Sequence, residues 1–277
     1  MQFIKRKHSG PMTRYLSPRK NHSTVTLPER VPIAEICISP QLDDPGPILE
    51  PYFLRKQPVV LRGAVSNQPA IQLWKSWDHL EQIVDGNTTV AVEIGGNYAS
   101  TEKNEIRFGD YISYLRFFEE RYGRSSEILP PATDLVYLAQ NEVVDGLREN
   151  FTVPSFTGTL GHGHPYSVMM WIGPYGCVSP LHFDPLDNIL MQFVGVKRAL
   201  LYPPNTQVYA GYGENQQNTS PLNPEQPLDL DTFPLLAELP PVIHCMLYPG
   251  DVLYIPQKWW HYVRTVETSI SINAWWR

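Results

Sequence analysis

The second half of the chain is a series of short apolar segments broken by turn-forming residues, and this feature limits the possible folds most strongly. Short segments rich in β-branched and aromatic side chains predict β-strands. About eight of them follow one another between residues 167 and 275, with turns at Gly195, Pro203-Pro204 and Pro249-Gly250-Asp251. So many strands in so short a stretch predict a sandwich or a barrel. The predicted strands cover residues 167–173, 179–184, 188–194, 197–202, 243–248, 251–255, 261–266 and 269–275.

The part before these strands has a mixed pattern. Apolar side chains at helical spacing predict helices over residues 69–84 and 108–118, and β-branched segments predict strands at 57–62, 88–94 and 135–139. The sequence therefore predicts a mainly β protein with flanking helices, in which an α/β N-terminal part (31–160) precedes a core β-barrel (161–277). Residues 205–240, rich in Pro, Asn and Gln, form a long insertion between two barrel strands, and insertions of this length are often functional.

Charge divides the chain into a basic tail and an acidic body. The net charge is -6, but residues 1–30 carry seven Lys and Arg against one acid. Residues 31–277 therefore carry 15 basic and 27 acidic side chains, a net charge of -12. An acidic body disfavours binding to a phosphate backbone and attracts cationic partners. We expect the partner to be a protein or peptide that presents a basic residue, and not a nucleic acid.

The basic composition of residues 1–30 predicts an unstructured tail, or alternatively a mitochondrial targeting segment. They are poor in acids and contain no apolar core of a secretory signal. Gly10, Pro11 and Pro18 would interrupt an amphipathic helix, which disfavours targeting. We expect a cytoplasmic or nuclear protein, with a mitochondrial location as the alternative.

The cysteines and the hydropathy exclude two further classes. Cys37, Cys177 and Cys245 form no Cys-X-X-Cys pair, which disfavours a disulfide framework and a structural zinc site. No apolar run approaches the ~20 residues that a membrane-spanning helix needs, so we expect no membrane association.

The sequence Ser-Pro-Leu-His-Phe-Asp, residues 179–184, is the strongest functional signal. His182 and Asp184 are two residues apart, and on a strand such side chains point to the same face. His261 follows 79 residues later on a strand that a barrel can place beside the first. Such a His-X-Asp pair alone also occurs as a hydrogen-bonded pair in protein cores. Two imidazoles and one carboxylate, however, form the facial triad of iron(II) oxygenases, which leaves three positions open on an octahedral metal ion.

Four stretches occur in an order that resembles a known family: Tyr-Leu-Ala-Gln (137–140), Ser-Pro-Leu-His-Phe-Asp (179–184), Asp-Asn-Ile-Leu (187–190) and Trp-His-Tyr-Val-Arg (260–264). With these, residues 31–277 resemble the JmjC-domain 2-oxoglutarate oxygenases, and most closely their arginyl-hydroxylase branch. The resemblance implies a double-stranded β-helix, which is a cupin or jelly-roll-like barrel. It also implies iron(II) held by the catalytic residues His182, Asp184 and His261, 2-oxoglutarate as cosubstrate and O2 as oxidant.

Lys197 is the main candidate for binding the cosubstrate. It lies 15 residues after His182 among apolar neighbours, and a buried Lys needs an anionic partner. The resemblance implies that Lys197 binds the distal carboxylate of 2-oxoglutarate. It also implies that the pocket is completed by Tyr137, Trp171, Ser179, Asn188 and Asn273.

The substrate is the least determined part of this interpretation. Glu93 matches the acid that holds the substrate guanidinium in the arginyl-hydroxylase branch, which implies a protein hydroxylase acting on arginine or lysine. Lys103 departs from that branch, because an aromatic residue stands there in the arginyl hydroxylases. Three alternatives remain open: a histone lysine demethylase, a tRNA-base hydroxylase and a catalytically inactive scaffold that binds partners.

Overall fold

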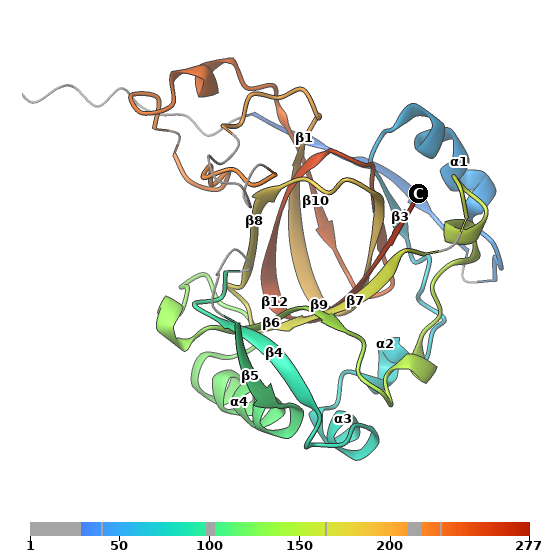
Figure 1. The fold of residues 1–277 in the computed structure, drawn as a ribbon, viewed down its shortest axis with the longest axis vertical. Coiled ribbons are helices and arrows are strands. Elements are labelled where there is room, and N and C mark those ends of the chain that lie inside the picture. Colours follow the sequence, from blue (N-terminus) through green and yellow to red (C-terminus); the bar gives the residue numbers. More distant parts are fainter. Residues whose placement is uncertain (1–28, 40, 98–102, 164, 210–217, 228) are drawn as a thin grey trace, which may run out of the picture.

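The computed structural model describes residues 29–39, 41–97, 103–163, 165–209, 218–227 and 229–277. At its centre is a β-barrel, and helices pack below and beside it (Figure 1). The prediction of a mainly β fold with flanking helices is therefore confirmed. The predicted tail lies outside the described residues as far as residue 28, and Arg30 already belongs to the first strand.

Two long antiparallel strands, β9 (Asp187–Tyr202) and β12 (Trp260–Trp276), run through the whole barrel. Each is bent, so its two halves belong to different walls. Where the end of β9 pairs with the start of β12, the neighbours are β10 (Val242–Leu247) and β8 (Val178–His182). The outer edge of β10 pairs with the short parallel strand β1 (Arg30–Pro32).

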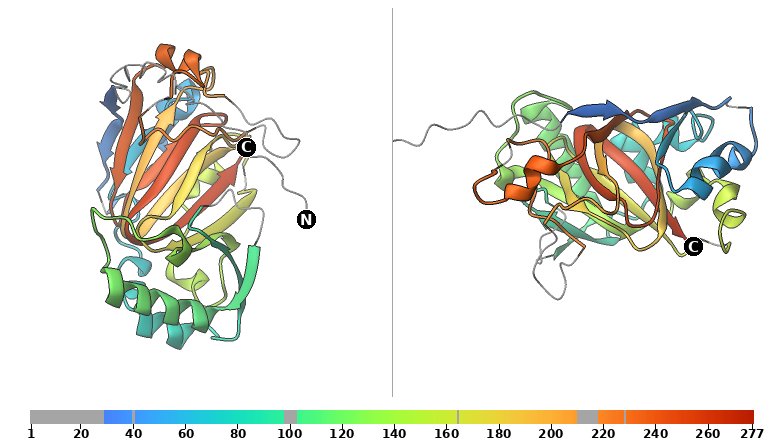
Figure 2. Two further views of the ribbon diagram at one scale, coloured as in Figure 1. Left: turned by 90° about the vertical axis from the view of Figure 1, so that its left-hand side faces the viewer. Right: turned by 90° about the horizontal axis from the view of Figure 1, so that it is seen from above.

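The opposite wall contains the start of β9 and the end of β12. Here β9 pairs with β11 (Val252–Ile255), and β12 pairs with β7 (Ser167–Gly173). The slanted strands of the barrel lie side by side in Figure 2. The remaining strands extend this wall at both edges: β3 (Val59–Arg62) and β2 (Ala34–Cys37) beyond β11, and β6 (Val136–Glu142), β4 (Thr89–Ile94) and β5 (Lys103–Arg107) beyond β7.

Gly195 bends β9 without ending it, which corrects the predicted turn. Its φ is +68°, and a Cβ there would lie 2.1 Å from the Thr268 carbonyl oxygen of β12. The register of the pair shifts between Thr265 and Ser271, opposite this glycine. The bulges absorb the bend while the ladder continues. The strands predicted at 188–194 and 197–202 are therefore one strand, as are those predicted at 261–266 and 269–275.

The helices pack mainly against this second wall, which contains the start of β9 and the end of β12. Helices α3 and α4 lie below the barrel (Figure 1). The helix predicted over 69–84 is two short helices, because Ser76 adopts an extended conformation and its side chain caps the His79 amide at 3.2 Å. The bounds of the helices are α1 (Gly46–Arg55), α2 (Ala70–Leu73), α3 (Trp77–Ile83) and α4 (Phe108–Tyr122), with short 3-10 helices η1 (Ala132–Asp134), η2 (Arg148–Asn150), η3 (Ser155–Gly158) and η4 (Pro234–Glu238). Within the described residues, no helix is long and apolar enough to cross a membrane.

The largest apolar core fills the space between the second wall and these helices. Trp74 packs on Phe193 with ring centroids 5.0 Å apart, and both side chains are fully buried. A separate cluster includes Leu190, Ile255 and Val263. Burying an apolar side chain of this size contributes about 1.5–3 kcal/mol to the stability of the fold. These clusters therefore hold the barrel wall against the elements that pack on it.

The insertion between β9 and β10 packs onto strand β8. The Phe183 amide donates to the Asn218 carbonyl at 2.9 Å, and Thr219 lies opposite His182. The insertion therefore contacts the backbone that carries one of the candidate metal ligands.

Glu225 holds the same insertion to the barrel. Its carboxylate is 2.8 Å from the Arg198 guanidinium on β9 and 2.5 Å from that of Arg264 on β12, and it accepts the Tyr262 hydroxyl at 3.1 Å. These partners hold the pKa of Glu225 below its usual value, although burial alone would raise it. The insertion is thus tied to the barrel by a charged group as well as by backbone pairing.

Candidate metal centre and cosubstrate pocket

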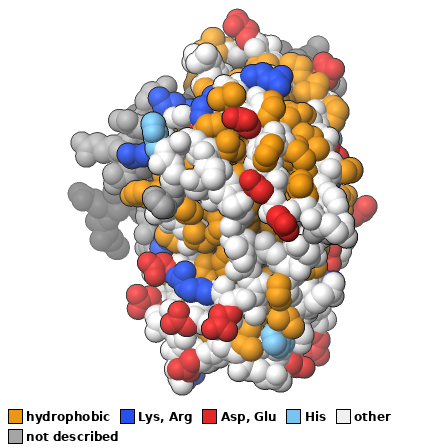
Figure 3. Space-filling model, turned by 90° about the vertical axis from the view of Figure 1, so that its right-hand side faces the viewer, with side chains coloured by type: hydrophobic (Ala, Val, Ile, Leu, Met, Phe, Trp, Pro, Cys, Tyr) orange, Lys and Arg blue, Asp and Glu red, His pale blue; other side chains and the backbone are white. Residues whose placement is uncertain are grey.

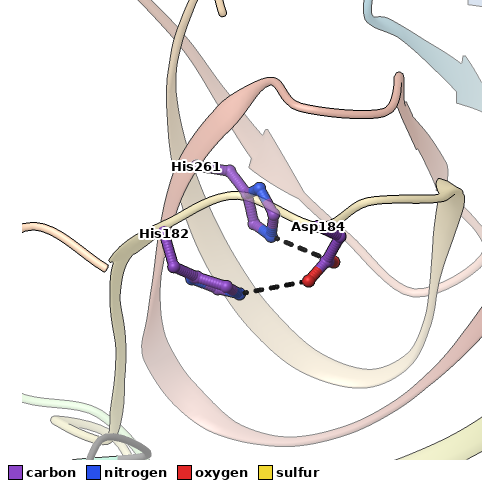
Figure 4. Close-up of side chains that lie close together, drawn as sticks. All are labelled: His182, Asp184 and His261. Carbon is purple, nitrogen blue, oxygen red and sulfur yellow. Dashed lines mark ion pairs between the residues drawn. The ribbon is translucent and has the colours of Figure 1, made fainter. Parts of the chain in front are cut away.

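Strand pairing brings together the three side chains that the sequence predicted as metal ligands. His182 ends β8, and His261 lies directly opposite it near the start of β12. Asp184 lies beyond the end of β8, so it converges through a turn of the chain and not through the strand alternation that the sequence suggested. The three side chains point toward one another (Figure 4), with ligand atoms all within 4.8 Å.

Both histidines present the same ring nitrogen to the centre of this group. His182 Nδ1 is 2.7 Å from the Pro180 carbonyl, and His261 Nδ1 is 3.0 Å from the Trp259 carbonyl. A carbonyl can only accept, so each Nδ1 carries the proton. Each Nε2 lone pair is then directed at Asp184, at 3.9 Å for His182 and 3.6 Å for His261. The two bonds from Nδ1 to the carbonyls therefore fix the tautomer whose unprotonated Nε2 can bind a metal ion.

Asp184 is held as an ionised carboxylate. Burial raises its pKa, but His261 and His182 and the hydrogen bonds from Trp275 Nε1 at 2.9 Å and Asn188 Nδ2 at 3.2 Å hold it below its usual value. Burial and the neighbouring His182 lower the pKa of His261 to about 4. An anionic carboxylate and a neutral imidazole are the forms that coordinate a divalent ion, so the donor set fits iron(II).

A narrow pocket leads from this triad into the barrel. All six residues predicted for the cosubstrate line it, namely Tyr137, Trp171, Ser179, Asn188, Lys197 and Asn273. The sequence did not single out Trp275, whose indole donates to Asp184. The aromatic final strand was visible in the sequence, but only the bend in β12 places this ring beside a turn 91 residues earlier.

Lys197 lies deep in the pocket with 2% of its surface exposed. Its Nζ is 3.4 Å from the Tyr137 hydroxyl and 5.9 Å from the ring centroids of Tyr137 and Trp171. Among the described residues, no carboxylate contributes to the pKa of Lys197, and burial lowers this pKa to about 7. A buried cation of this kind is stabilised by an incoming anion, so the pocket fits a dicarboxylate cosubstrate.

A line of amides joins this pocket to the triad. Asn273 Nδ2 donates to Asn188 Oδ1 at 2.6 Å, and Asn188 Nδ2 in turn donates to Asp184. Both asparagines are buried, so their orientation is fixed. Both line the pocket, and Asn188 orients the Asp184 carboxylate.

Glu93 lies next to this pocket without lining it. It is 1% exposed on β4, and it pairs with Tyr137 of β6 on one side and with Lys103 of β5 on the other. Lys103 Nζ is 4.0 Å from Glu93 Oε1, while the Lys103 side chain is 46% exposed. Lys103, which departs from the arginyl-hydroxylase pattern, therefore faces Glu93, which matches it.

Comparisons with known proteins agree with this geometry. Residues 45–277 match the family profile described as a cupin-like domain. The chain is 34% identical to Jumonji C domain-containing protein 5 of Drosophila melanogaster, over 92% of this chain and 64% of the relative. It is 36% identical to Lysine-specific demethylase JMJ30 of Arabidopsis thaliana, over 82% of this chain and 52% of the relative. For Lysine-specific demethylase 8 of Xenopus tropicalis the identity is 32%, over 81% and 49%. The chain spans about half to two thirds of the length of these relatives.

Proposed function

Since the chain belongs to the cupin-like JmjC family of iron(II)- and 2-oxoglutarate-dependent oxygenases, we propose that it is a dioxygenase that hydroxylates a basic side chain of a polypeptide. One observation carries the proposal: the His182–Asp184–His261 triad opens into the pocket that contains the buried Lys197. A triad without an anion site would fit many metal proteins. Both together support a metal ion that is chelated by 2-oxoglutarate.

The residues have separate tasks in this reaction. When bound, iron and 2-oxoglutarate supply the oxidation of a substrate C–H bond by O2, with succinate and CO2 as the other products. His182, Asp184 and His261 would hold the metal from one side and leave the other side open. Lys197 would bind the far carboxylate of 2-oxoglutarate, and the apolar walls would exclude water.

Glu93 supports a cationic substrate. Its buried carboxylate lies one strand from Tyr137, so a substrate guanidinium or ammonium held there lies near the pocket. Its ion pair with Lys103 is long, at 4.0 Å, and the Lys103 side chain is 46% exposed, so water weakens this attraction. A substrate cation could therefore take the place of Lys103. The net charge of -12 over residues 31–277 would attract it.

Demethylation of lysine is the second candidate, because two of the relatives named above are called lysine-specific demethylases. The same oxidation of an N-methyl carbon gives an unstable hydroxymethylamine that releases formaldehyde. The two candidates therefore differ in their substrate and in the product that remains on it.

Mass spectrometry of candidate peptides separates the two functions. Unmethylated and N-methylated arginine and lysine peptides are incubated with the chain, iron(II), 2-oxoglutarate and 18O-labelled O2. Hydroxylation leaves one 18O atom on an unmethylated peptide, whereas demethylation removes a methylene unit and releases formaldehyde. His182→Ala is the control for adventitious oxidation. Succinate formation without either product on any basic peptide would contradict the proposed substrate class.

A further inference from the structure

Two segments outside the β-strands determine the positions of two of the triad residues. The first, residues 183–186, contains Asp184 and joins β8 to β9; we call it the Asp184 segment. The second, residues 256–259, joins β11 to β12 and ends two residues before His261; we call it the Trp259 segment. They contact each other, because the Lys258 amide donates to the Asp184 carbonyl at 2.7 Å. The His261 ring also depends on the second segment through its bond to the Trp259 carbonyl.

Asp187, the first residue of β9, connects these two segments. Its Oδ1 accepts the Tyr254 hydroxyl at 2.8 Å and the Gln257 amide at 3.2 Å. Tyr254 lies on β11 just before the Trp259 segment, and Gln257 lies within it. The Asp187 side chain is almost completely buried, so these bonds form away from water. Asp187 directly follows the Asp184 segment, so these bonds hold the end of that segment against the Trp259 segment.

Lys56, which follows α1, completes the connection from a distant part of the chain. Its Nζ is 2.8 Å from Asp187 Oδ2, and its carbonyl accepts the Trp259 indole N–H at 2.9 Å. The residue has a left-handed backbone conformation, with φ +51°. Its ammonium group lies over the Phe53 ring at 4.2 Å. A single residue therefore holds both Asp187 and the Trp259 segment.

We propose that Asp187 and Lys56 are positioning residues that set the separation of Asp184 and His261 for the metal ion. The inference rests on the proposed function in one respect, that the triad binds the metal. Asp187 touches no ligand atom in the contacts of the described residues; it acts through the two segments. Partners of this kind, one step removed from the ligands, change metal affinity by about 10- to 100-fold when they are altered.

Asp251 offers a matched control elsewhere in the barrel. Like Asp187, it is a buried acid that is paired with a cation, Arg62, and that accepts backbone amides, those of Tyr248 and Gly63. It precedes β11, and its bonds reach neither the Asp184 segment nor the Trp259 segment. Loss of its charge should lower the stability of the fold as much as the equivalent change at Asp187, without reaching the triad.

The test compares cobalt(II) binding with thermal stability in the full chain. The dissociation constant for cobalt(II), a spectroscopic probe for the iron site, is measured by absorption titration without substrate. The melting temperature is measured on the metal-free protein. We expect Asp187→Asn to raise the dissociation constant by about 10- to 100-fold. Asp251→Asn should lower the melting temperature to a similar extent and leave cobalt(II) binding at the wild-type value.

Each failure has its own signature. Equal cobalt(II) affinity in Asp187→Asn and Asp251→Asn overturns the positioning role and leaves the triad assignment intact. Wild-type binding by His182→Ala overturns the metal site itself. If Asp187→Asn does not fold, Lys56→Met decides, because that side chain is 40% exposed and its loss is tolerable. Reduced cobalt(II) affinity in Lys56→Met supports the inference, and wild-type affinity overturns it.

Discussion

At the scale of single residues, burial gives Lys197 a titration that can be observed. Its pKa is lowered to about 7 by burial, whereas a carboxylate bound to the ammonium would raise it again. Only the protonated form attracts 2-oxoglutarate, so the cosubstrate should bind with constant affinity below pH 7. Above pH 7 each unit should weaken binding by up to about tenfold, because the free protein must first take up a proton.

The measurement is a titration of the metal-loaded chain with 2-oxoglutarate between pH 6 and pH 9. Lys197→Arg is the control, because a guanidinium stays protonated throughout this range. That variant should bind more weakly but with a flat pH profile. A flat profile in the wild-type chain would show that Lys197 keeps its proton or that another cation binds the cosubstrate.

Glu93 carries the second prediction at this scale. Glu93→Ala should lower peptide-dependent turnover by one to two orders of magnitude, since the substrate cation loses a buried partner. Peptide-independent decay of 2-oxoglutarate should persist, because the triad and Lys197 are untouched. Lys103→Met serves as the control: it removes the competing cation, so the KM for peptide should stay the same or fall. Equal loss of both activities in Glu93→Ala would assign that residue to the fold instead.

The residues of the candidate metal centre were more predictable from the sequence than the course of the chain that brings them together. The spacing of His182 and Asp184 and the distance to His261 predicted which three side chains lie together, because a facial donor set needs these residue types. The reason given for their convergence was wrong in part, since Asp184 lies past the end of β8. Trp275 and Lys56 were not singled out, and Asp187 was noted only within the stretch 187–190, because their contacts join segments that no local pattern relates.

At the scale of secondary-structure elements, strand existence was predictable and strand ends were not. The apolar segments predict the strands of the barrel, but the sequence also predicts a turn at Gly195, because a glycine between two apolar runs often ends a strand. In the structure, β9 continues through this glycine. The edge strands β1, β2 and β5 and helix α1 were not predicted. The three strands have few buried side chains and therefore show little hydrophobic periodicity. Helix α1 contains Gly46, Pro47 and Pro51, which are unfavourable residues in a helix.

The bend at Gly195 requires a residue without a Cβ at this position of β9, and this requirement can be tested. Gly195→Ala places a Cβ 2.1 Å from the Thr268 carbonyl oxygen and forces a φ of +68° on an alanine. We expect a loss of about 3 kcal/mol in the free energy of unfolding, measured by urea denaturation. Gly158→Ala is the control, because its Cβ would meet nothing within 4 Å. Similar stability of the two variants would mean that the bend relaxes without cost.

At the scale of the whole molecule, we expect charge to affect the approach of the proposed cationic substrate. Residues 29–277 carry 16 basic and 28 acidic side chains, a net charge of -12, whereas residues 1–28 carry six basic and no acidic ones. On the face shown in Figure 3, acidic side chains gather over the lower part. An acidic surface steers a cationic peptide toward the protein, and this attraction acts mainly on the association rate.

Salt should therefore weaken the capture of substrate without changing the chemistry. The Debye length falls from ~30 Å at 0.01 M salt to ~8 Å at 0.15 M, so kcat/KM for a peptide with flanking Lys and Arg should fall by about tenfold while kcat stays constant. A peptide with Gln at the flanking positions should show almost no salt dependence. Deleting residues 1–28 should steepen the dependence, because the net charge changes from -6 to -12. A slope that is the same for both peptides would place recognition in the pocket alone, because only a field around the whole molecule distinguishes their flanks.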